Sequence, residues 1–155
     1  MKPGARWQDA EIPWFVTVLG APSGSNAVSR LRSQYALVDK SAYPGGPPFS
    51  LENDELGIAV VFIKDRVDCI MFCAQPASGF GGPKTPCFFG ARHGMSRERV
   101  HRLYGPPDAE IEPRPHITLA HAGIDRYHRK SFTVAFVYDA VTRGLEILIF
   151  EAIAT

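Results

Sequence analysis

The sequence lacks any apolar run long enough to cross a membrane. No stretch approaches the about 18 consecutive apolar residues expected of a transmembrane helix, and no apolar segment of signal-peptide length follows the first positive charges. We therefore expect a cytoplasmic protein that neither spans a membrane nor is exported.

An excess of charge of either sign is also missing. The chain has 17 Lys and Arg residues against 16 Asp and Glu residues, a formal net charge of +1. A nucleic-acid-binding domain is usually more basic than this, and a nucleic-acid mimic needs a strongly acidic surface. We therefore expect no nucleic-acid partner.

Cysteine is scarce, with only Cys69, Cys73 and Cys87. An odd number of cysteines in a chain without an export signal is typical of reduced thiols and not of a disulfide framework. Cys69 and Cys73 are four residues apart in a strand-like run, so their side chains should share one face of a strand. We expect both to pack as small hydrophobic side chains.

The length and composition favour one globular domain. A chain of 155 residues with 45% hydrophobic residues can bury one core and is short for two. We therefore assign residues 1–155 to a single domain.

The clearest predicted helix spans Arg97 to Tyr104. Ser96 can cap its N-terminus, and Gly105 stands where a helix is expected to end. Met95 and Val100 occupy the positions of a hydrophobic staple across the first turn.

A second helix is predicted upstream, capped by Ser23 or Ser25 and carrying Val28, Leu31 and Tyr35 on one face.

The segments around this helix are predicted to be extended or irregular. Ile12 to Leu19 has the composition of a strand or a buried extended segment. Two stretches rich in proline and glycine, Ser41 to Asn53 and Pro76 to Pro86, are typical of surface loops.

β-Branched and aromatic runs predict two hairpins. The first pairs Gly57–Ile63 with Val67–Cys73 across Lys64-Asp65-Arg66, and the second pairs Phe132–Tyr138 with Leu145–Phe150. Alternate residues of the second hairpin form an apolar face that we expect to lie in the core: Phe132, Val134, Phe136 and Tyr138.

The two halves of the chain, residues 1–86 and 87–155, have the same order of parts. Each has a short capped helix, a long irregular connection and a hydrophobic hairpin. This order predicts a degenerate tandem helix-plus-hairpin repeat, with two unrelated halves as the alternative. The fold class follows as α+β, an antiparallel sheet with short helices packed on one face.

The motifs for catalysis are incomplete. His116-Ile117-Thr118 resembles one of the two His-x-Thr motifs of the two-histidine phosphoesterases, in which one histidine acts as base and the other as acid. The second motif is missing. No Gly-x-Ser-x-Gly elbow occurs, and Cys87 lacks the local signatures of a cysteine protease.

A metal site is the other chemical candidate. His116, His121, Asp125 and His128 lie close together in the chain, but their spacing matches no closed zinc pattern, and Gly123 indicates a polar surface loop. We therefore predict no catalytic residue, no metal and no cofactor. A small hydrolase or metal-dependent enzyme using the segment His116 to His128 is the alternative.

The helix segment Gly94 to Asp108, which reads GMSRERVHRLYGPPD, carries a resemblance to known proteins. Together with Asp125-Arg126-Tyr127 and with Tyr138-Asp139 after a hydrophobic strand, it is similar to the helix-and-sheet unit of the BamE (SmpA/OmlA) and β-lactamase-inhibitory-protein-like group. Many small bacterial immunity proteins look similar too, including those paired with toxins of contact-dependent or type VI secretion systems. The match is clearest from about Phe88 to Phe150.

The resemblance implies a protein that blocks a partner without chemistry of its own. BamE-type lipoproteins carry an export signal and a lipid-attachment cysteine, and the sequence shows neither, which argues against an outer-membrane role. The resemblance therefore implies a cytoplasmic immunity protein that binds and occludes a cognate toxin domain. We expect the contact to involve aromatic, arginine and neighbouring polar residues of the predicted loops, namely Tyr43, Phe49, Phe80, Asp125, Arg126, Tyr127, His128 and Arg129.

Overall fold

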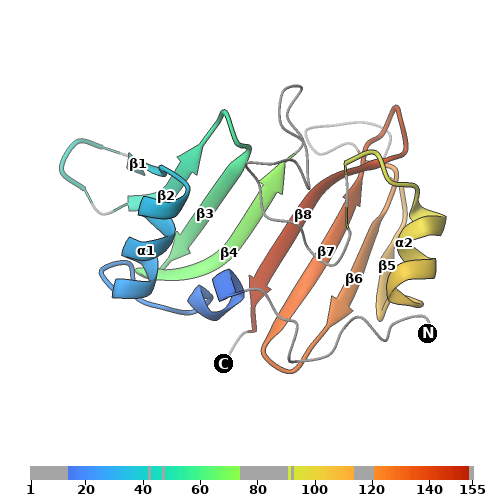
Figure 1. Cartoon of the computed structure of the whole chain (residues 1–155), viewed down its shortest axis with the longest axis horizontal. Helices are drawn as coiled ribbons and strands as arrows, with labels where there is room; N and C mark the ends of the chain where they lie inside the picture. Colours follow the sequence, from blue (N-terminus) through green and yellow to red (C-terminus); the bar gives the residue numbers. More distant parts are fainter. Residues whose placement is uncertain are drawn as a thin grey trace.

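The computed structural model describes residues 14–41, 43–46, 48–73, 91, 93–113 and 121–153. These residues form one eight-stranded antiparallel sheet with two short α-helices (Figure 1). The α+β prediction is confirmed. The predicted loop Pro76 to Pro86 lies outside the described residues.

The first half of the sheet follows a short 3-10 helix and an α-helix. The elements are η3 (Trp14–Val18), α1 (Asn26–Gln34), β1 (Val38–Ser41), β2 (Pro48–Asn53), β3 (Ile58–Ile63) and β4 (Arg66–Cys73).

The second half also begins with an α-helix. Its elements are α2 (Arg97–Tyr104), β5 (Ala109–Ile111), β6 (Ile124–His128), β7 (Phe132–Tyr138) and β8 (Leu145–Ala152). The strand order β1-β2-β3-β4-β8-β7-β6-β5 makes β4 and β8 the central pair, which joins the four-stranded meander β1 to β4 to the four-stranded meander β5 to β8. A helix followed by four strands therefore occurs twice. The predicted helices and hairpins are in this order, but β1 and β2 in the first half, and β5 and β6 in the second, occupy parts of the connections that were predicted to be irregular.

The core lies on the helix side of the sheet. In Figure 1 the elements η3, α1 and α2 all lie on the near side of the strands. One row of directly paired residues on this side crosses six strands, and each of its side chains is at most 2% exposed: Leu51, Val60, Ile70, Phe150, Val134 and Tyr127. The predicted core face of β7 is confirmed, since Phe132, Val134, Phe136 and Tyr138 are all buried.

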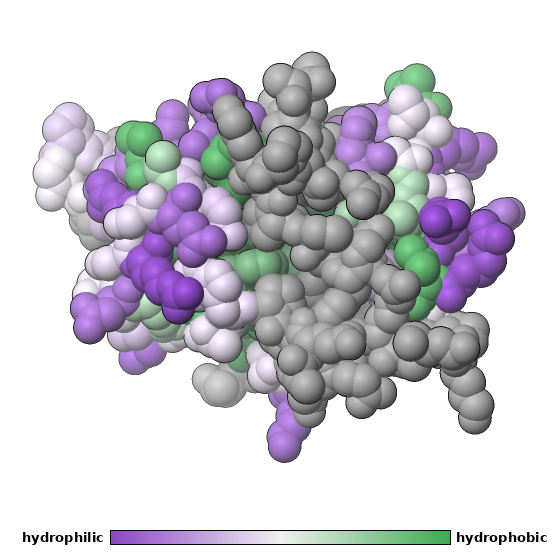
Figure 2. Space-filling view, in the orientation of Figure 1, coloured by the Kyte–Doolittle hydropathy of each residue, from purple (hydrophilic) through white to green (hydrophobic). Residues whose placement is uncertain are grey.

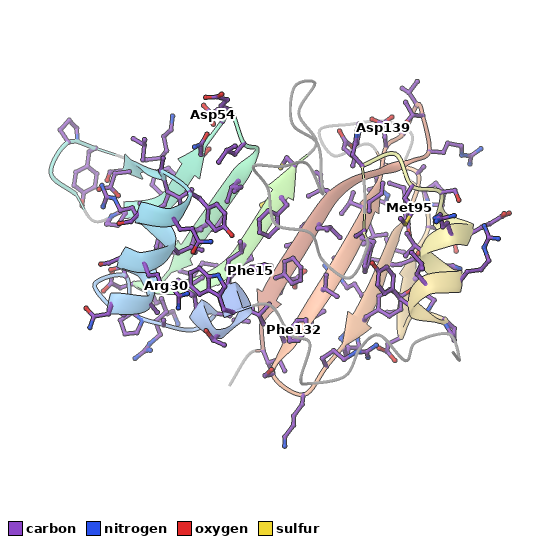
Figure 3. All side chains as sticks on the ribbon, viewed as in Figure 1. Phe15, Arg30, Asp54, Met95, Phe132 and Asp139 are labelled. Atoms are coloured by element: carbon purple, nitrogen blue, oxygen red, sulfur yellow. The ribbon has the colours of Figure 1, made fainter. Side chains whose placement is uncertain are left out.

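Aromatic rings join the two halves beneath η3. Phe15 packs edge-to-face on Phe72 of β4 and on Phe150 of β8, with 5.1 Å between ring centroids in both pairs (Figure 3). Phe72 and Phe150 also contact each other at 5.8 Å. Such pairs contribute beyond their buried area, so this cluster helps hold β4 against β8.

Both helices begin at a predicted serine cap, and α2 also ends where its sequence predicts. The Ser25 and Ser96 side chains accept hydrogen bonds from the backbone N–H groups of Val28 and Arg99. Gly105 ends α2 with φ of 84°, in the left-handed region that favours glycine. Met95 and Val100, the staple pair, are buried.

The hairpins are confirmed, with one adjustment. Ile63 pairs with Arg66, so the first turn contains only Lys64 and Asp65. Both of these residues have positive φ values, 52° and 64°, as a tight type I′ turn requires.

The prediction of a strand at Ile12 to Leu19 is wrong for its described part. Trp14–Val18 is a 3-10 helix, and its buried residues include Phe15 and Val18. Residues three apart share one side of such a helix, so η3 can direct both side chains onto the sheet.

Two segments predicted as surface loops contain strands. Pro48–Asn53 within the first proline-rich stretch is β2, and Ile124–His128 after Gly123 is β6. In β2 the polar Ser50 and Glu52 alternate regularly with Phe49 and Leu51, but the surrounding proline and glycine residues are typical of a loop. In β6, Asp125 lies on the core side, where alternation predicts an apolar residue. Neighbouring strands supply the pairing that their local composition does not predict.

In both halves a side chain of the sheet donates a hydrogen bond to the C-terminal end of the helix. The Asn53 side chain on β2 donates to the carbonyl of Tyr35, the C-cap of α1. The Tyr127 hydroxyl on β6 donates to the carbonyl of Gly105, the C-cap of α2, at 2.9 Å. In both halves the second strand therefore satisfies a carbonyl that the helix leaves unpaired.

We predict that Tyr127→Phe lowers the free energy of unfolding by about 1 kcal/mol, because the buried Gly105 carbonyl loses its donor. Tyr43→Phe is the control, since the Tyr43 side chain is exposed, and it should have little effect. Urea denaturation of both variants measures the difference. Equal stability of the two variants would contradict the role of the Tyr127 hydroxyl.

Candidate functional site

The buried carboxylate of Asp125 makes polar contacts with α2 and with a neighbouring strand of the sheet. Asp125 on β6 is 0% exposed. Its oxygens accept hydrogen bonds from Arg97 Nε (3.1 Å) and a terminal guanidinium nitrogen (2.6 Å), and from the Tyr138 hydroxyl (2.8 Å). His101 Nε2 lies 2.7 Å from the second oxygen. We call these four residues the Asp125 cluster.

The local fold explains how the Asp125 cluster assembles. Arg97 and His101 are one helical turn apart on α2, so they share the face that meets the sheet. Gly123 leaves room for Arg97, because a Cβ atom there would lie 2.3 Å from a guanidinium nitrogen. Gly123 also has φ of 126°, which other residues rarely adopt.

The charges in the Asp125 cluster reinforce one another. The hydrogen bond to Asp125 raises the pKa of Arg97. Burial, and then the nearby Asp125, raise the pKa of the Tyr138 hydroxyl far above its usual value. Arg97 therefore stays charged and Tyr138 stays protonated, so both remain donors to the carboxylate.

The Asp125 cluster fits a structural role better than a chemical one. Ligand atoms of His101, Glu110 and Asp125 lie within 4.8 Å of one another, a spacing that could suit a metal ion. However, Arg97 already neutralises Asp125, and a second cation would have to displace it. Within the described part of the chain, His101 makes no hydrogen bond to a hydroxyl or thiol nucleophile.

We predict that Asp125→Ala lowers the free energy of unfolding by about 3 kcal/mol or more, because it leaves the donors of Arg97 and Tyr138 unpaired. Glu110→Ala is the matched control: Glu110 pairs with Asp125 across β5 and β6 but is exposed. We expect that variant to change stability by about 0.5 kcal/mol or less. A small loss for Asp125→Ala, or an equal loss for both variants in urea denaturation, would contradict a structural role.

The opposite face of the sheet is apolar as well. Strand pairing places apolar side chains on this side, and we call ten of them on β3, β4, β6, β7 and β8 the outer face: Ala59, Val61, Cys69, Met71, Cys73, Ile124, Ala135, Val137, Ile147 and Ile149. Ala135 and Val137 are buried among their neighbours, and the other eight are half-buried. No helix or strand of the described ranges packs on this face.

This composition is unusual for a face on which no helix or strand of the described residues packs. An antiparallel sheet that is solvated on one side normally has strands in which apolar and polar residues alternate. On the helix side of the molecule, the outward surfaces of α1 and α2 are hydrophilic, as Figure 2 shows. The outer face instead presents aliphatic and sulfur-containing side chains across β3, β4, β8, β7 and β6. Contiguous apolar surface of this kind is typical of a binding surface.

Arg126 and Glu151 form an ion pair beside the outer face. A terminal nitrogen of Arg126 on β6 is 3.6 Å from Glu151 Oε1 on β8. The arginine reaches this carboxylate across β7, where Ala135 is 1% exposed. Arg126 Nε is buried and has no hydrogen-bond acceptor among the described residues, whereas the Arg126 side chain as a whole is 39% exposed at the edge of the apolar surface.

Two thiols also lie on the outer face, as the spacing of Cys69 and Cys73 predicts. Burial, followed by the charges of Asp68 and Glu151, raises the pKa of Cys69 to about 11. Burial also raises the pKa of Cys73. Since the thiolate is the reactive form, both side chains should be poor nucleophiles at neutral pH.

We predict that alkylation of Cys69, measured in a Cys73→Ser/Cys87→Ser variant, accelerates with pH until about pH 11. The same variant unfolded in urea is the control. Its alkylation rate should level off near the ordinary thiol pKa of about 8.5. A plateau at that ordinary value in the folded variant would contradict the described environment of Cys69.

The structure distributes the residues predicted to bind a partner over several places. Tyr43 and Phe49 are exposed near the β1 edge. Arg126 and the exposed His128 project from β6 on the outer side of the sheet. Arg129 is half-buried and lies 3.6 Å from an Asp108 oxygen.

Two of these predicted contacts require correction, and one cannot be placed. Asp125 and Tyr127 are buried at 0% and 1% exposure, since they serve the core and the helix cap, so neither side chain is accessible to a partner. Phe80 lies outside the described residues.

The histidine-rich segment does not assemble a site from its described members. Asp125 and His128 point to opposite sides of β6. His121 is buried, and its Nδ1 accepts a hydrogen bond from the Gly123 backbone. His116 lies outside the described residues.

Sequence reasoning missed the Asp125 cluster and the outer face. The i, i+4 spacing of Arg97 and His101 on an amphipathic helix was an available signal for the cluster, but the sequence did not show that β6 supplies its carboxylate. The alternate residues Val61, Met71 and Ile149 carried the signal for the second apolar face, because they are apolar where a solvated strand face would be polar.

Comparison with protein-family models, curated proteins and solved structures finds no match. Among the described residues, no helix has the length and apolar character needed to span a bilayer.

Proposed function

We propose that this chain is an immunity protein that binds a cognate secreted toxin domain and occludes its active site. The apolar outer face, without a second layer in the described chain, is the observation that carries the proposal. An eight-stranded sheet paired along its whole width is a rigid platform, which limits the ordering cost of binding. The proposal includes a cytoplasmic location, where the toxin of a contact-dependent or type VI system would be neutralised.

The size of the outer face fits the centre of a protein interface. Ten side chains, each covering about 4.8 Å across the strands and about 6.7 Å along them, cover roughly 300 Å². A standard interface buries about 800 Å² on each partner. The outer face would therefore supply the apolar centre, and surrounding residues such as Arg126 would supply a polar rim.

The side chains of the outer face suggest the shape of the partner. The face has no aromatic residue among its ten members and includes two alanines and two cysteines. Such a surface is shallow, so it suits a domain that presents protruding aliphatic or aromatic side chains. The Arg126 side chain, which is 39% exposed, suits a partner carboxylate at the rim.

The alternative of a small hydrolase or metal-dependent enzyme has less support. It relies on the segment His116 to His128, whose described polar members are directed to different parts of the fold. Zinc binding or phosphoester hydrolysis by the purified protein would move this alternative ahead of the immunity function.

We predict that Met71→Lys abolishes protection against the toxin while the protein stays folded. Met71 lies in the middle of the outer face, and a buried unpaired ammonium should weaken binding by about 2 kcal/mol or more, roughly 30-fold. Val141→Lys is the matched control, because Val141 is 88% exposed in the turn between β7 and β8.

The experiment first isolates the partner with the tagged protein and expresses the partner's C-terminal domain alone. Growth should stop, and co-expression with the wild type or with Val141→Lys should restore it. Met71→Lys should fail to restore growth at an unchanged melting temperature. The proposal is contradicted if no toxic partner exists, or if a folded Met71→Lys protein protects fully.

A further inference from the structure

Exposed apolar residues gather at one end of the sheet, around the edge strand β1. Val38 on β1, Tyr43 in the following loop and Phe49 on β2 are 59%, 61% and 50% exposed. β1 pairs only with β2 among the described strands. One side of its backbone is therefore open to a further strand.

A shallow groove lies on each side of β1. Val38 and Lys40 line one groove together with Glu52. Asp39 and Ser41 line the other groove together with the loop that contains Tyr43. Successive residues of a strand point to opposite faces, so β1 offers receiving surface to the alternating side chains of an added strand.

The Tyr43 side chain is held in place although it is exposed. Gly46 N–H donates to the Tyr43 carbonyl at 3.1 Å, and Gly45 has φ of 77°, as in a type II turn. The Ser41 hydroxyl closes the loop on the Gly46 carbonyl at 3.2 Å. The ring covers Gly46 so closely that a Cβ atom there would lie 2.5 Å from it. An aromatic anchor that is already ordered loses little entropy on binding.

We propose that the β1 edge binds an extended segment of another protein as a ninth antiparallel strand, with Tyr43 as its aromatic anchor. Backbone hydrogen bonds would supply affinity, and the two grooves would select side chains, as in other cases of strand addition. This site is separate from the outer face and does not depend on the toxin being the partner.

The charges on β1 argue against a second copy of this chain as the occupant. Directly opposite residues of an antiparallel pair point to the same face of the sheet. Two β1 strands related by a two-fold axis must therefore pair each residue with itself or with a residue an even number of positions away. The two registers with the greatest overlap place Asp39 opposite Asp39 or Lys40 opposite Lys40. Like charges directly opposite each other are destabilising.

The same charges specify a complementary segment. An antiparallel strand should carry an acidic residue opposite Lys40, followed by a basic residue opposite Asp39 and an apolar residue opposite Val38. The pair formed by Asp39 and Arg32, at 3.7 Å, is exposed on both sides and so offers little competition. The preferred partner is an extended segment with acidic, basic and apolar residues in that order.

Two blocked hexapeptides test this inference on the full-length protein. The first reads Thr-Thr-Glu-Lys-Val-Thr, and the second exchanges the Glu and the Lys. Amide chemical shifts followed during the titration should place the binding site at β1. The first peptide should bind on the order of fivefold more tightly than the second, because both cross-strand charge pairs are attractive with the first peptide and repulsive with the second. The Asp39→Lys/Lys40→Asp variant should reverse the preference.

Glu98→Lys/Arg99→Glu is the matched control, because it exchanges two exposed charges on α2 and should leave the preference unchanged. Shifts that centre away from β1, equal affinities for both peptides, or no detectable binding would overturn the inference. A dimer that dissociates in the Asp39→Lys/Lys40→Asp variant would also overturn it, by identifying a second copy as the occupant. None of these results bears on toxin neutralisation, so the two proposals fail independently.

Discussion

The pairing of β4 with β8 is the interaction on which the rest of the structure depends. Five consecutive residue pairs, from Cys69 with Glu151 to Cys73 with Ile147, join two four-stranded meanders into one sheet. On the helix side, this pairing brings Phe72 and Phe150 together beneath Phe15. On the other side, it aligns Met71 with Ile149. A continuous core and a continuous apolar outer face are therefore two consequences of the same strand pair.

The strength of local signals decides which parts of the fold could be predicted. The α2 helix carries a serine cap, a hydrophobic staple and a terminal glycine, so its bounds followed from the sequence. β2 begins at Pro48 in a stretch rich in proline and glycine, and β6 carries Asp125 on its core side, so both segments resembled loops. Their pairing depends on residues distant in the chain, which local propensity does not report.

The same limit explains the outcome for the candidate site. Asp125 and Tyr127 were expected at a surface because they are polar residues in an apparent loop, and each instead satisfies buried groups between α2 and the sheet. The outer face was overlooked because a core side was assigned only to the second predicted hairpin, and its other side was not considered. Only the register across β3, β4, β8 and β7 shows that the alternate residues form a second apolar surface.

The most direct test of the account is whether the outer face is accessible in the free protein and covered in the complex. Hydroxyl-radical footprinting can compare Met71 on the outer face with Met95, which is 9% exposed beside α2. The account predicts that Met71 oxidises faster than Met95 in the free protein and becomes protected once the toxin domain is bound. If Met71 is as protected as Met95 without a partner, or stays reactive in the complex, the outer face is not the binding surface.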